Sequence, residues 1–167
     1  MAGALHEYLS ADHEILAGLL ERSPGESGSI DMETYGRFRA GLLKHIGVEE
    51  KILFPACRQK SGEPLPLETK IRLDHGALAA LLVPTPSLKI ISVMRVVLSS
   101  HNGLEEDPGG VYDACDQRLG SDAAGVLAEI RRAGEVPVHP YNDGPGVIEA
   151  VRRAVLRAGY EFDALYR

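Results

Sequence analysis

Hydrophobic residues recur every three or four positions along most of the chain, which is the spacing of an amphipathic α-helix. This pattern predicts four long helices over residues 3–22, 31–59, 67–82 and 88–107. The segments between them contain clusters of Ser, Gly and Pro, which are residues that end helices and form turns. Alternating apolar and polar positions between turn dipeptides, the pattern typical of strands, are missing from the sequence. The sequence therefore predicts an all-α fold.

Four helices of this length with short connections favour an up-down-up-down four-helix bundle, in which antiparallel neighbours pack their apolar faces together. We predict this bundle over residues 1–120 and a C-terminal helical extension over residues 121–167. The extension is expected to contain a short helix at 122–133, a loop, and an amphipathic helix at 147–165. The residues expected on the buried side of that last helix are Ile148, Val151, Val155 and Phe162.

Each predicted bundle helix carries a histidine on its apolar stripe, where a hydrophobic residue would otherwise stand. In the second and fourth helices a glutamate follows the histidine by four residues, so the two side chains share one helix face. The bundle is therefore predicted to contain a polar layer inside its core. The residues of this layer are His13, His45, Glu49, His75, His101 and Glu105.

The stretch that contains the second histidine–glutamate pair nearly repeats the stretch that contains the first. Residues 45–57 read HIGVEEKILFPAC, and residues 101–115 read HNGLEEDPGGVYDAC. Both stretches contain a histidine, two consecutive glutamates, and later an aromatic residue followed by alanine and cysteine, with one residue between in each case. This repeat indicates that two of the helices contribute equivalent groups to a roughly two-fold symmetric centre.

Imidazoles and carboxylates inside an apolar core need compensation, because an unpaired buried charge costs several kcal/mol in a fold stabilised by about 5–15 kcal/mol. A pair of metal ions would provide it, with each glutamate bridging the ions and the imidazoles capping them. Nitrogen and oxygen donors suit iron, manganese or zinc. Six protein ligands for two ions leave open coordination positions, which favours reactive metal over purely structural metal. The alternative is a plain helical bundle without metal, in which the four histidines are hydrogen-bonded.

The acidic residues next to this layer are expected to be surface charges. Glu50 and Glu106 each follow a layer glutamate by one residue and so point about 100° away from it on the helix. Asp12 and Asp74 each precede a layer histidine and are also expected to contact solvent. The alternative for the two glutamates is a role as partner of a metal ligand or as proton relay.

Two other histidines and three tyrosines are further candidates for the site. His6 shares a face with the first layer histidine but lies about 10 Å further along the helix, and His139 lies in a predicted loop, so neither is expected to bind metal. The tyrosines at positions 8, 35 and 112 are expected to pack in or near the core, with redox activity near the site as the alternative.

Composition limits the classes of binding partner and the cellular compartment that we expect for this protein. The net charge is −6 and the 18 Lys and Arg residues are scattered, so a nucleic-acid partner is not expected. The sequence lacks a run of about 18 apolar residues and a signal-peptide pattern at its start, and we expect a cytoplasmic protein without membrane contact. Cys57 and Cys115 are the two cysteines and form no CxxC motif, which indicates buried thiols rather than a disulfide framework.

Together these motifs resemble those of the hemerythrin-like family, also called the HHE cation-binding family. The resemblance covers about residues 3–118 and implies a four-helix bundle holding a non-haem di-iron centre, with Glu49 and Glu105 as carboxylate bridges. The stretches that match its four helices in order are ADHEIL around His13, HIGVEEKILFPA around His45, LDHGALAALL around His75 and HNGLEED around His101.

The chain departs from the oxygen-carrying members of that family at two positions. Those members have a second histidine where this chain has Ala79, and they have an aspartate five residues after the fourth-helix histidine, whereas Glu105 follows His101 by four. The chain is similar instead to the branch with four histidines and two glutamates, which includes iron-cluster repair proteins, iron-sensing domains and peroxide-consuming proteins.

That resemblance implies two iron ions, Fe²⁺ or Fe³⁺, for which zinc or manganese can substitute. It further implies binding or reaction of a small oxidant, namely oxygen, peroxide or nitric oxide, in stress protection or sensing. One form of this function is a di-iron oxidoreductase that consumes peroxide. The alternative is a non-enzymatic iron or oxygen sensor that acts through residues 122–167 as a homodimer contact or a surface for a protein partner.

Overall fold

The computed structural model describes residues 2–167, and within this range the chain is all-α, as predicted, with an isolated β-bridge between Pro24 and Ile30 as its β pairing. None of the helices in this range is both long and apolar enough to cross a membrane. The helices are α1 (Ala4–Arg22), α2 (Met32–Val48), α3 (Phe54–Ser61), α4 (Glu68–Leu81), α5 (Leu88–Glu106), α6 (Val111–Leu119), α7 (Ala123–Arg132), α8 (Val147–Arg157) and α9 (Phe162–Leu165).

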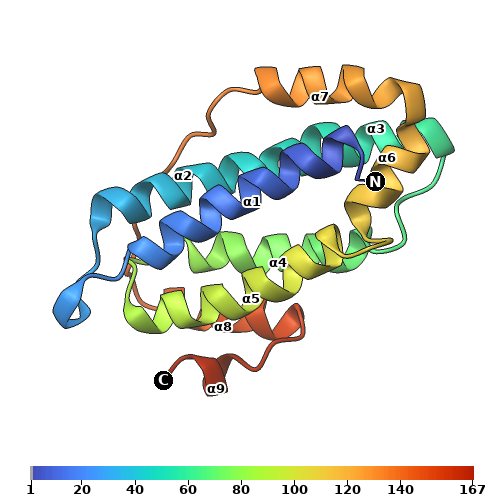
Figure 1. Ribbon diagram of the computed structural model, residues 1–167. Coiled ribbons are helices and arrows are strands. Elements are labelled where there is room, and N and C mark those ends of the chain that lie inside the picture. The colour runs from blue at the N-terminus through green and yellow to red at the C-terminus, as the bar shows by residue number, and fades with distance from the viewer. Residues whose placement is uncertain (1) are drawn as a thin grey trace.

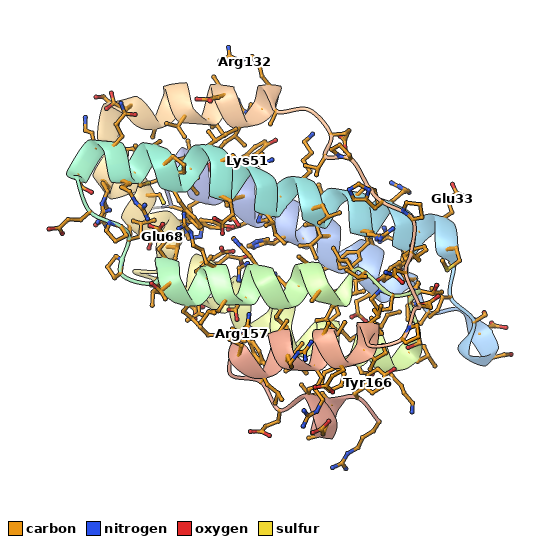
Figure 2. All side chains as sticks on the ribbon, turned by 180° about the vertical axis from the view of Figure 1, so that it is seen from behind. Glu33, Lys51, Glu68, Arg132, Arg157 and Tyr166 are labelled. Atoms are coloured by element: carbon orange, nitrogen blue, oxygen red, sulfur yellow. The ribbon has the colours of Figure 1, made fainter. Side chains whose placement is uncertain are left out.

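Helices α1, α2, α4 and α5 lie lengthwise beside one another and form the body of the molecule (Figure 1). Helix α7 covers one side of this body, and α8 and α9 cover the opposite side. Figure 2 shows the same arrangement from behind, with Arg132 of α7 on one side and Arg157 of α8 and Tyr166 on the other. The predicted boundary between residues 120 and 121 stays a prediction.

Side-chain caps mark where two of the long helices begin. The Asp31 carboxylate accepts hydrogen bonds from the backbone N–H groups of Glu33 and Thr34, at 3.0 and 3.1 Å, and so starts α2. The Ser87 hydroxyl oxygen accepts from the N–H of Ile90 at 3.2 Å at the start of α5. These bonds satisfy N–H groups that have no partner within the helix.

The predicted second helix is interrupted by a π-helical segment, Glu49–Leu53, before it continues as α3. The sequence predicted one helix through residue 59. Because Pro55 has no N–H and its ring clashes with the carbonyl four residues earlier, a regular α-helical turn cannot continue through it. The wider π turn avoids this conflict, and such turns are frequent at functional sites. Here the π segment begins at Glu49, a residue of the predicted polar layer.

Two clusters of buried apolar side chains form the core. The first cluster includes Leu16, Leu42, Leu78 and Val97 of the four long helices, and the second includes Leu5, Phe54, Ile71 and Val111. On each long helix the layer histidine stands between a residue of the first cluster and one packed with the second. The polar layer therefore separates two apolar regions, and both regions shield it from water.

The C-terminal prediction needs two corrections. The expected helix at 147–165 ends at Arg157, because Gly159 adopts φ = 98°, a left-handed conformation that reverses the chain before α9. Ile148, expected inside, is 38% exposed. The remaining buried positions are confirmed: Val151, Val155 and Phe162 pack in the first cluster. The extension thus contributes side chains to the core of the long helices.

Candidate metal centre

The six residues of the predicted polar layer come together in the structure. They form two groups of four residues, and the potential ligand atoms within each group all lie within 4.8 Å of one another. Glu49 and Glu105 belong to both groups, which places one carboxylate from each repeat between two sets of imidazoles. All six side chains are buried. The first group is His13, His45, Glu49 and Glu105, and the second is Glu49, His75, His101 and Glu105.

Each histidine of the first group turns its Nε2 atom toward the cluster. The Nε2 atoms of His13 and His45 are 2.9 Å apart. Nε2 of His45 lies 3.3 Å from Oε1 of Glu49, and Nε2 of His13 lies 3.3 Å from Oε2 of Glu105. Four donors thus face a common centre from α1, the end of α2, the π segment and α5.

The second group contains buried polar atoms that no hydrogen bond satisfies. Nε2 of His75 lies 3.1 Å from Oε2 of Glu49, and Nε2 of His101 lies 3.2 Å from Oε2 of Glu105, both without hydrogen-bond alignment. Unpaired buried polar atoms are costly and rare in folded proteins. Convergent imidazole and carboxylate atoms of this kind fit a bound cation. The inward-facing atoms of this group left without a partner are Glu49 Oε2, His75 Nε2, His101 Nε2 and Glu105 Oε1, and Nδ1 of His101 also has none.

A carboxylate from another part of the chain faces the outer nitrogen, Nδ1, of every layer histidine. Asp12 lies 2.7 Å from Nδ1 of His45, and Glu50 lies 2.7 Å from Nδ1 of His75. Metal-binding histidines usually donate a hydrogen bond from their second ring nitrogen to such a carboxylate, which fixes the orientation of the ring. The other two pairs are His13 with Glu106, and His101 with Asp74 at 3.7 Å.

These four carboxylates correct the expectation of surface charges. Asp74 is fully buried, and the side chains of Glu50, Glu106 and Asp12 are only 27, 33 and 39% exposed. A side chain one step from a layer residue does point away from its own helix's ligand, as expected. That direction leads it to the outer edge of an imidazole on an adjacent helix, which no single-helix argument can show.

The electrostatics of the layer follow from this mixture of charge and burial. Burial alone would lower the pKa of the His75 imidazole, but the carboxylates of Glu49 and Glu50 raise it to about 9. Burial also opposes protonation of His45, whose pKa is nevertheless raised well above its ordinary value by Glu49 and Asp12. In the metal-free protein the layer therefore holds protons, and a bound cation would replace them.

Tyr112, on α6, reaches the first group from beyond the predicted helices. Its hydroxyl oxygen lies 2.6 Å from Oε1 of Glu49 and 3.0 Å from Oε2 of Glu105. It also lies 3.1 and 3.2 Å from Nε2 of His13 and His45. Burial and the two carboxylates raise the pKa of this phenol well above its ordinary value. The helix that positions it, α6, was not predicted, although the aromatic residue of the repeat was a signal.

The other candidates do not join the two groups. Nδ1 of His6 lies 2.7 Å from the carboxylate of Asp113, and the exposed His139 contributes its backbone carbonyl to a hydrogen bond with Arg39. Cys57 and Cys115 are free thiols and fully buried, as expected. Within residues 2–167, the histidines of the two groups are therefore the four that the helical pattern selected.

A cavity of about 510 Å³ lies between α1 and α5 and reaches the layer from one side. Leucines at positions 16, 20 and 98 line it, as do the ion-paired Glu21 and Arg95, and His13 with its partner Glu106 lies where it reaches the layer. Small molecules thus have a largely apolar approach to the outer side of one layer histidine.

Comparisons of the chain with protein-family models, with curated proteins and with solved structures found no match. The chemistry of the centre follows from its donor set: buried imidazole nitrogens and carboxylate oxygens in two groups that could hold a metal ion.

Proposed function

We propose that this chain is a hemerythrin-like, non-haem di-iron protein that binds or reacts with a small oxidant. The observation that carries the proposal is the sharing of Glu49 and Glu105 between two donor groups. A single ion would use one group and leave the imidazoles of the other unpaired, whereas two ions use both. Because these two carboxylates belong to both groups, they would be shared by the two ions.

The arrangement of the helices supports the same proposal. Helices α1, α2, α4 and α5 run in alternating directions along the body (Figure 1), and each contributes one imidazole to the layer. We infer from this an up-down-up-down four-helix bundle of the hemerythrin-like type, with its metal site built from facing helices. Helices α6 to α9 lie outside those four.

The chain's own residues would prepare the centre for reaction. The two apolar clusters exclude water, and outer carboxylates hold the imidazoles of His13, His45 and His75 with Nε2 inward. Bound iron would supply the electrons for reduction of oxygen, peroxide or nitric oxide. Glu106 contacts both His13 and the cavity, so it is placed to hold or pass a proton at the approach to the centre. Stress protection through peroxide consumption is the activity that we propose.

Metal content and peroxide turnover test this function directly. After anaerobic reconstitution with ferrous iron, we expect two irons per chain and repeated consumption of added peroxide. His45→Ala should lose iron and turnover, while His139→Ala, which changes an exposed histidine outside both groups, should retain them. Absence of bound iron would contradict the di-iron centre, and a single stoichiometric reaction with peroxide would contradict the catalytic role alone.

A second function, metal-dependent sensing through the C-terminal segment, is favoured by one contact network. The Lys70 ammonium donates to Asp74, the partner of His101, and also to the carbonyl oxygen of Ala158 and the hydroxyl of Tyr160, at 2.8 and 3.2 Å. These contacts connect the layer to the turn between α8 and α9. In this alternative the state of the metal changes the order of that segment and hence the binding of a partner or second copy.

A further inference from the structure

The hydroxyl of Tyr112 has more polar atoms close to it than a phenol can form hydrogen bonds with. Four potential metal-ligand atoms lie between 2.6 and 3.2 Å from its oxygen: two carboxylate oxygens and two imidazole nitrogens. A tyrosine hydroxyl offers one hydrogen and accepts at most two hydrogen bonds. Ordinary hydrogen bonding therefore does not explain why all four atoms converge on this oxygen.

The spacing of the five atoms matches donors that share one ion. Two donors bound to the same ion at about 2.1 Å and at right angles are about 3.0 Å apart. The close separations among the Tyr112 oxygen, the two imidazoles and the two carboxylates range from 2.6 to 3.3 Å. The tyrosine oxygen is next to all four other atoms, as the apical donor of a five-coordinate ion would be.

The repeat in the sequence shows that this hydroxyl breaks the symmetry of the centre. Tyr112 occupies the position in the second copy that Phe54 occupies in the first, since each is followed, after one residue, by Ala-Cys. The ring of Phe54 is parallel to that of His75 in the second group, with centroids 6.2 Å apart, and the ring of Tyr112 is 5.6 Å from that of His13. Equivalent aromatic residues thus flank the two groups, and only the one at the first group carries an oxygen.

We propose that Tyr112 is a fifth protein ligand, through its phenolate oxygen, to the ion held by His13 and His45. The inference rests on the proposed function, because it requires a metal at the first group. On binding, the O–H bond of the phenol breaks, its proton passes to solvent, and an oxygen–metal bond forms without any change in oxidation state. The two ions are then inequivalent: the one at His75 and His101 has fewer protein ligands and offers more positions to an oxidant.

Visible absorption and resonance Raman spectra of the iron(III)-loaded full chain test this assignment. A phenolate bound to iron(III) gives an intense charge-transfer absorption, and excitation in that band enhances the vibrations of the tyrosine ring. We expect both signals in the wild-type protein and their complete loss in Tyr112→Phe with two irons per chain retained. The matched control is Tyr35→Phe, which removes a phenol that is buried in the first cluster without a hydrogen-bond partner; this variant should keep both signals.

The outcomes separate this inference from the function on which it rests. Two irons per chain without phenolate vibrations in the wild-type protein would overturn the role of Tyr112 and leave the di-iron centre standing. Failure of the wild-type chain to bind iron would overturn both. Should Tyr112→Phe not fold, Raman spectra of wild-type protein labelled with ring-deuterated tyrosine still decide whether a tyrosine binds the metal, and retention of both signals in Tyr35→Phe excludes the other fully buried tyrosine.

Discussion

The Nδ1 atom of His75 lies 2.7 Å from Oε1 of Glu50, while the opposite nitrogen of the same ring faces Glu49. The imidazole thus stands between an inner carboxylate and an outer one that follow each other in sequence. Each of the other three layer histidines also faces an inner and an outer carboxylate, and among these three the two carboxylates are consecutive only at His13. The three rings of His13, His45 and His75, each hydrogen-bonded from outside in this way, are oriented before any metal binds.

Replacing Glu50 with glutamine should weaken metal binding without removing a ligand. The side chain keeps its shape but loses the charge that orients and polarises His75, and loss of such an outer partner typically lowers metal affinity about 10- to 100-fold. Competition with a chromophoric chelator measures the change in affinity. Glu14→Gln is the matched control, because Glu14 is exposed and next to His13 in sequence. Equal affinity of wild type and Glu50→Gln would show that the outer carboxylate has no such role.

The stability of the metal-free protein should fall as the pH rises from neutral to alkaline. The pKa of His75 is raised from 6.5 to about 9, so its protonated form stabilises the fold fully below about pH 6.5, and this contribution is lost as the pH rises through 9. The pKa of His13 and that of His45 are raised in the same direction. A shift of this size corresponds to on the order of 3 kcal/mol for His75.

Urea unfolding of the chelator-treated protein at pH 6.5 and pH 9 measures this difference in the free energy of unfolding. His75→Gln should show a smaller drop over the same interval, because one of the titrating groups is gone. A free energy of unfolding that is unchanged or higher at pH 9 would contradict the prediction.

Lys70→Met should uncouple the C-terminal turn from the metal centre. The methionine keeps much of the aliphatic stem but cannot donate to Asp74, Ala158 or Tyr160. If the sensing function holds, metal binding slows amide hydrogen exchange around residues 158–166 in the wild type, and this protection is lost in the variant. Lys51→Met, at an exposed lysine away from this network, is the control. Identical exchange in metal-free and metal-bound wild-type protein would count against sensing through this segment.

Two glycine substitutions should have opposite effects on stability. Gly159 has φ = 98°, so Gly159→Ala should cost about 1–2 kcal/mol by forcing a side chain into a left-handed conformation. Gly125 lies inside α7, and a Cβ there would meet open space, so Gly125→Ala should add about 0.4–1 kcal/mol. Thermal unfolding of the two variants checks both values. A neutral Gly159→Ala would argue against the sharp break between α8 and α9.

The long helices were predictable because their signals are local. Each has an apolar stripe at helical spacing, and each ends near Gly, Pro or a polar cap within a few residues of the predicted boundary. The same spacing placed the six layer residues on inward faces, which the structure brings together. The π segment at Glu49 and the break at Gly159 were not predicted, because a helical stripe tolerates an added residue or a short turn without an obvious change of pattern.

The all-α class and the six residues of the polar layer follow from the amino-acid pattern alone, since both depend on the position of a side chain around its own helix. Which carboxylate faces which imidazole depends on how the helices pack, because those partners come from adjacent helices. The packing also sets the place of Tyr112, which the chain reaches only after Pro108 and two glycines end α5 and let α6 pack in the second core cluster. Contacts between elements depend on how the helices pack, and the apolar stripe of one helix does not show which residues of other helices it will contact.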